Sequence, residues 1–118
     1  MANPNILSTT AISGQSNSFY LTTAATTIVS GSIGTVYKIN NITVSNLDGS
    51  SSFNFNLNHV NANGASIPFA YQVTVPAYAS VVVIDKSSTI YITENQSLSA
   101  LANANNKVGL VISWEAIS

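Results

Sequence analysis

One histidine and four carboxylates are the side chains of this sequence best suited to acid–base chemistry near neutral pH. Catalysis requires such groups to converge in space. His59 stands near the end of a segment with alternating apolar residues, where a lone histidine is more often packed or at an edge than a base. The carboxylates occupy turns or strand ends far apart in the sequence: Asp48, Asp85, Glu94 and Glu115. The sequence therefore predicts no catalytic residue, and we expect the chain not to be an enzyme.

The patterns that mark metal and cofactor sites are also missing. The chain has no cysteine and only one histidine, so neither a thiolate site nor a histidine cluster can form. It has no phosphate-binding glycine loop and no nucleophile elbow. A carboxylate pair could hydrolyse glycosides, but no motif indicates one. Residues 46–50 could offer oxygens to Ca²⁺, although one carboxylate is poor provision for that ion. We therefore expect no metal site and no cofactor.

The charge composition limits the classes of partner. Charged residues make up 6% of the chain, against about 25% in ordinary soluble proteins. Lys38, Lys86 and Lys107 cannot neutralise a row of phosphates, so nucleic acid is not an expected partner. No signal peptide and no membrane-spanning apolar run is present, so we expect synthesis in a cytoplasm and no membrane contact. A surface with so few charges is weakly protected against self-association, which favours a homo-oligomer or a subunit of a larger assembly.

The elements that carry these residues are predicted to be strands. Short runs of β-forming residues alternate with turns, and no helix of conventional length is expected. The pattern is typical of an all-β antiparallel sandwich with about eight short strands, forming one domain over residues 19–118. The expected segments are 19–22, 26–30, 35–46, 52–60, 67–75, 80–84, 89–93, 97–102 and 107–117.

Period-2 alternation selects the candidate core, because alternate residues of a strand share one face. The apolar faces of segments 52–60 and 107–117 supply Phe53, Phe55, Leu57, Val108, Leu110, Ile112 and Trp114. The opposite face of 52–60 carries Asn54, Asn56 and Asn58. We interpret this row either as a solvated strand face or as a stripe that binds a sugar or a partner.

Two further segments leave alternatives open. Apolar positions change parity across Asn40 and Asn41, so either a β-bulge lies there or the strand passes between sheets. Residues 1–18 are predicted to form an extended N-terminal arm or lead-in, which packs on the sandwich edge or against a neighbouring subunit. The candidate assembly residues are Ile6, Leu7, Ile12 and Phe19.

Several short segments at strand ends and turns between Asn41 and the C-terminus form a distinctive set of motifs. They are V-P-A at 75–77, I-D-K at 84–86, E-N-Q-S-L at 94–98, S-W-E-A-I-S at 113–118 and a hairpin with Asp-Gly at 48–49. This pattern resembles small virion proteins of tailed bacteriophages, in particular cyanophages. That family usually has Gly-Asp where Asn95 and Gln96 stand, and Tyr-Glu-Glu in place of 114–116.

The resemblance implies a jelly-roll-like sandwich that forms part of the phage virion. The expected role is a capsid decoration (cement) protein, in which a trimer binds the major capsid protein and stabilises the head. The resemblance transfers no active-site residues. The alternative is a protein of the tail, neck or fibre that contacts host surface glycans, and a free carbohydrate-binding module is a third possibility.

Overall fold

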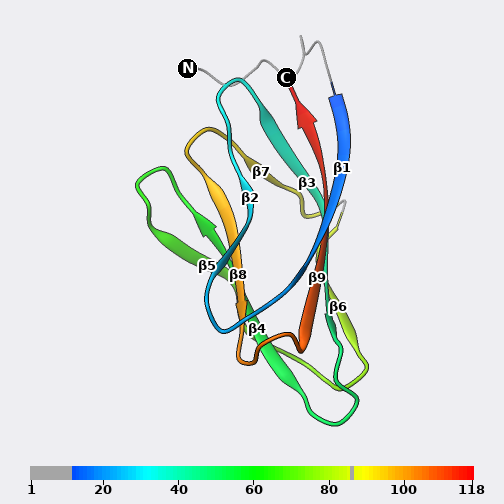
Figure 1. Ribbon diagram of the computed structural model, residues 1–118. Coiled ribbons are helices and arrows are strands. Elements are labelled where there is room, and N and C mark those ends of the chain that lie inside the picture. The colour runs from blue at the N-terminus through cyan, green and yellow to red at the C-terminus, as the bar shows by residue number, and fades with distance from the viewer. Residues whose placement is uncertain (1–11, 86) are drawn as a thin grey trace.

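The computed structural model describes residues 12–85 and 87–118, and these residues form nine strands in two antiparallel sheets. The sheets face each other as the two layers of a sandwich, so the expected fold class is confirmed (Figure 1). The described residues include no helix that could cross a membrane. The strands are β1 (Ile12–Tyr20), β2 (Thr26–Ser30), β3 (Val36–Asn46), β4 (Phe53–Val60), β5 (Ser66–Val75), β6 (Ser80–Ile84), β7 (Ile90–Ile92), β8 (Ser97–Ala102) and β9 (Val108–Ile117).

The strand pairing is nested, as if one long hairpin had been folded over on itself. β1 pairs with β9, β2 with β8, β3 with β6 and β7, and β4 with β5. β9 also pairs with β3, and β8 with β4. The sheet orders are therefore β1-β9-β3-β6, with β7 also on β3, and β2-β8-β4-β5. We call these sheet A and sheet B. This nested order is a jelly roll, as expected.

The core lies between the two sheets and is built from alternate residues of each strand. Phe55 and Leu57 of β4 belong to this core together with Leu110 and Ile112 of β9, and each is at most 1% exposed. Val108 is fully buried as well, whereas Phe53 and Trp114 are half-buried and pack against the core. The sandwich is therefore stabilised by apolar burial between the sheets, with no disulfide.

β1 begins at Ile12, well before the boundary at residue 19 expected from the sequence. All of β1, including residues 12–18, pairs with β9, from Ile12 opposite Ile117 to Tyr20 opposite Gly109. This part of β1 is polar and exposed, so the alternation that reveals a half-buried strand is missing there. Ladder hydrogen bonds to β9, rather than burial, hold this edge strand in place. Residues 1–11, and with them Ile6 and Leu7, lie outside the described residues.

Candidate functional site

The side chains with acid–base chemistry are distributed over both sheets. His59 lies on β4, paired with Ile67 of β5 and Leu98 of β8. Asp48 follows β3, Asp85 follows β6, Glu94 follows β7, and Glu115 lies on β9. Within residues 12–85 and 87–118, no group of three or more potential metal-ligating side chains comes together.

Asp48 stabilises its own turn instead of forming a cation site. Its Oδ1 accepts hydrogen bonds from the backbone N–H of Ser50 at 2.9 Å and from the Ser50 hydroxyl at 2.8 Å. These two donors, with a smaller contribution from Lys107, hold the pKa of Asp48 below its usual value. The Lys107 ammonium lies 3.9 Å from Asp48 Oδ2. Both carboxylate oxygens of Asp48 therefore have a partner, which is Ser50 for Oδ1 and Lys107 for Oδ2.

The parity change at Asn40 and Asn41 is a β-bulge, which decides between the two alternatives raised above. The register between β3 and β9 shifts there, so that Ile39 pairs with Trp114 and Asn41 with Ser113. β3 remains in sheet A on both sides of the bulge. Asn40 is the extra residue, and a bulge of this kind changes the direction in which side chains point.

On the edge of β3 opposite to β9, the pairing is interrupted at the level of Asn40 and Asn41. β6 pairs with β3 up to Ile42, and β7 resumes the pairing at Ile39. β6 and β7 are therefore two parts of one strand position, separated by a loop that begins at Asp85. On this side of β3, none of the described residues pairs with Asn40 or Asn41. A bulge on one side and a broken strand on the other leave a notch in the sheet.

Polar side chains from three sequence-distant segments line this notch. Two hollows of about 600 and 460 Å³ share Asn40 as a lining residue. We call the whole the polar notch; its lining residues are Lys38, Asn40, Asn41, Asp85, Ser87, Thr89, Ser113 and Glu115. Asp85 and Glu115, which are far apart in the sequence, thus border one site.

Hydrogen bonds fix several of these groups in position. Asn40 Nδ2 donates to Glu115 Oε1 at 3.0 Å. Asp85 Oδ1 accepts from the Ser87 hydroxyl at 2.7 Å and from the Ser87 backbone N–H at 2.9 Å. The Ser87 hydroxyl is the main reason why the pKa of Asp85 lies below its usual value. Asp85 is therefore ionised at neutral pH and already oriented.

The opposite end of sheet A presents a surface without charges, which we call the assembly face. Register places its residues in two rows across the sheet, and their chain neighbours Phe19, Leu110 and Val44 point into the core. Tyr20 is 68%, Val82 57% and Val111 50% exposed. The rows are Ser18, Val111, Thr43 and Val82, followed by Tyr20, Gly109, Ser45 and Ser80.

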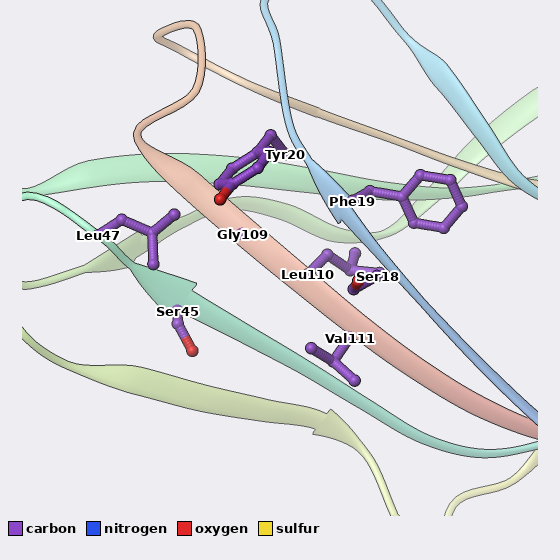
Figure 2. A pocket seen from close by; sticks show the side chains of 8 residues that line it. All are labelled: Ser18, Phe19, Tyr20, Ser45, Leu47, Gly109, Leu110 and Val111. Carbon is purple, nitrogen blue, oxygen red and sulfur yellow. The ribbon is translucent and has the colours of Figure 1, made fainter.

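An apolar groove of about 270 Å³ lies in the assembly face, lined mainly by residues of β1 and β9 together with Leu47. Figure 2 shows Tyr20 and Phe19 leaving β1 in different directions, with Tyr20 beside Gly109. The absence of a side chain at Gly109 keeps this groove open, because a Cβ at this position would lie 3.3 Å from Leu47 Cδ1. Of the predicted assembly residues, Phe19 lines this groove while packing on the core, and Ile12 is exposed at the far end of β1.

The asparagine row of β4 has mainly structural contacts. Asn56 Oδ1 accepts a hydrogen bond of 2.6 Å from the backbone N–H of Gln72, a bulged residue of β5 with a φ of 50°. Asn58 is 8% exposed, and its Nδ2 lies 3.5 Å from Ser99 Oγ. Asn54 is bound through its backbone N–H to Asn103 Oδ1 at 3.1 Å. The side chains of Asn56 and Asn58 therefore make contacts within sheet B. These contacts support neither a stripe that binds a sugar nor a fully solvated strand face.

The sequence does not predict the polar notch as a site, although it contains two signals of it. The parity change indicated a bulge at Asn40, and the turn at 85–88 indicated a break between two strands. The sequence could not show that the bulge and the break between the two strands both lie at the same level of β3.

No protein-family model matches the chain, and no curated protein matches it.

Proposed function

We propose that this chain is a non-enzymatic structural protein of a bacteriophage particle. Its role is that of a capsid decoration (cement) protein, which forms a homotrimer, binds the major capsid protein and stabilises the head. The resemblance of residues 41–118 to small virion proteins supports the phage assignment. The assembly face is the single structural observation that carries the proposal.

The assembly face shares one feature with the core of a protein–protein interface, which is the absence of charged side chains. The cores of such interfaces are depleted of charged residues and enriched in aromatic ones. None of the side chains in its two rows is charged, and Tyr20, Val82 and Val111 are all at least half exposed. A cement protein acts by burying such a surface across capsid subunits, so that rupture of the shell must also break these contacts.

Charge insertion into the assembly face tests the proposal. The Val111→Glu variant should fold, because Val111 is half exposed, yet its occupancy on purified heads should fall by at least about tenfold. Thr74→Glu, on the exposed side of β5 in sheet B, is the matched control and should bind like the unaltered chain. Equal occupancy of both variants would show that capsid binding does not use this face.

The number of copies in the particle tests the role itself. A decoration protein should be present in a number set by capsid symmetry and should be removed from the head without loss of the tail. A few copies located at the tail would refute the head assignment and favour the tail-associated alternative. Sedimentation of the purified chain measures whether it is a trimer.

A further inference from the structure

The polar notch has no part in the proposed capsid contact, and its chemistry is that of a ligand site. We propose that the polar notch binds a neutral, polyhydroxylated ligand, such as a hexose unit of a glycan. This inference goes beyond the proposed function and does not depend on it, because it concerns the other half of sheet A.

The described lining residues select against ions. Glu115 and Asp85 would repel an anion, and the lowered pKa of Asp85 keeps its charge at neutral pH. Lys38 balances the charge of Glu115 in the hollow that they share, and no group of three or more potential metal-ligating side chains comes together among the described residues. Glu115 is moreover engaged by Asn40. The described residues thus offer neither a cluster of cations for an anion nor a set of ligands for a metal ion, which leaves an uncharged ligand as the class that fits.

The same residues suit a ligand with many hydroxyl groups. Each hydroxyl donates one hydrogen bond and accepts others, and an amide offers both a donor and an acceptor. The notch places two amides, two carboxylates, one ammonium group and several hydroxyls around two open hollows that share Asn40. The bulge at Asn40 and the turn of Asp85 hold part of this set in position before a ligand arrives, which lowers the cost of binding.

An aromatic side chain flanks the notch on the same face of the sheet. Lys38 pairs with Tyr91 of β7 on one side and with Glu115 of β9 on the other. Directly opposed residues of paired strands share a face and lie about 5 Å apart at Cβ. Tyr91 is 46% exposed, whereas its chain neighbour Ile92 is fully buried, so the phenol ring faces solvent beside the notch. Such a ring can pack against the apolar C–H face of a sugar.

The test is a titration of the full chain, followed by amide NMR, with neutral trisaccharides of glucose, mannose or N-acetylglucosamine. We expect at least one of them to shift the side-chain amide signals of Asn40 and Asn41. Tyr91→Ala should weaken that binding about tenfold. Tyr71→Ala is the matched control, since Tyr71 is 63% exposed on β5 of the other sheet, and it should bind normally.

Lys38→Met provides a second variant, which should also weaken binding, in case Tyr91→Ala does not fold. Absence of shifts with all three trisaccharides would overturn the proposal, as would binding that neither variant affects. Shifts caused only by Ca²⁺, or only by a sialylated or uronic-acid trisaccharide, would show an ion site instead. Capsid occupancy is measured separately, so failure here leaves the decoration role untouched.

Discussion

Replacement of Phe55 by alanine tests whether the core between the sheets is the main source of stability. Phe55 is 1% exposed and lies on β4 between Val73 of β5 and Ala102 of β8. β4 is an inner strand of sheet B, so its neighbours cannot move far to fill the space left by the ring. We therefore expect Phe55→Ala to lower the free energy of unfolding by about 4 kcal/mol, within the range for a buried phenylalanine.

This loss corresponds to a large change in melting temperature. An unfolding entropy of about 2.1 cal/mol/K per residue gives roughly 0.25 kcal/mol/K for 118 residues. A loss of about 4 kcal/mol should then lower the Tm by about 16 °C. Urea unfolding followed by Trp114 fluorescence and by circular dichroism measures the free energy directly, provided that the m-value does not change.

Phe69→Ala is the matched control, because it removes the same side chain from an exposed place. Phe69 is 36% exposed on β5, an edge strand, and should lose only about 1 kcal/mol, or roughly 4 °C. Similar losses at Phe55 and Phe69 would refute the placement of the core. A loss below about 1.5 kcal/mol at Phe55 would do the same.

Three further predictions use the same urea assay. Asn46→Ala should cost about 1–3 kcal/mol, because its buried Nδ2 donates to the carbonyls of residues 51 and 75, at 2.8 and 2.9 Å; an unchanged midpoint would contradict this. Trp114→Phe should be neutral or stabilising, since it removes a buried Nε1 that has no hydrogen-bond partner, and circular dichroism would reveal any marked loss. The pKa values of Asp48 and Asp85 are lowered from 3.8, so their contribution to stability is complete above about pH 4 and is lost as the pH falls through the lower folded-state values. Asp85→Asn should make this acid loss shallower, and an identical pH profile would refute it.

The strands of this protein could be predicted because their signals are local. The cleanly alternating segment 52–60 became β4, and the turn at Asp48 ended β3 as expected. β1 is the exception over residues 12–18, where both faces are polar and exposed. Its position depends on hydrogen bonds to β9, which lies at the far end of the chain. Pairing through backbone hydrogen bonds alone requires no alternation of apolar and polar residues in the sequence of the strand.

The asparagines show the same limit at the level of single residues. Asn54, Asn56 and Asn58 look equivalent in the sequence, yet only Asn58 is buried, and Asn56 accepts a hydrogen bond from a bulged residue of β5. Whether each of these asparagines is buried depends on how the neighbouring strands pair with β4 beside it. The bulge at Asn40, in contrast, was visible in the parity of its own strand, but the loop opposite it was not.

The sequence alone determined that this chain is an all-β sandwich with few charges, because alternation, turn residues and charge are properties of short segments. Only the tertiary structure decided that the sandwich is a jelly roll, since nested pairing joins strands from opposite ends of the chain. It also decided where the two candidate sites lie. The assembly face and the polar notch are both made by residues that become neighbours through the register of β1, β9, β3, β6 and β7. Register is set by the summed hydrogen bonding and packing of the whole sheet, so neither surface can be found in any one strand.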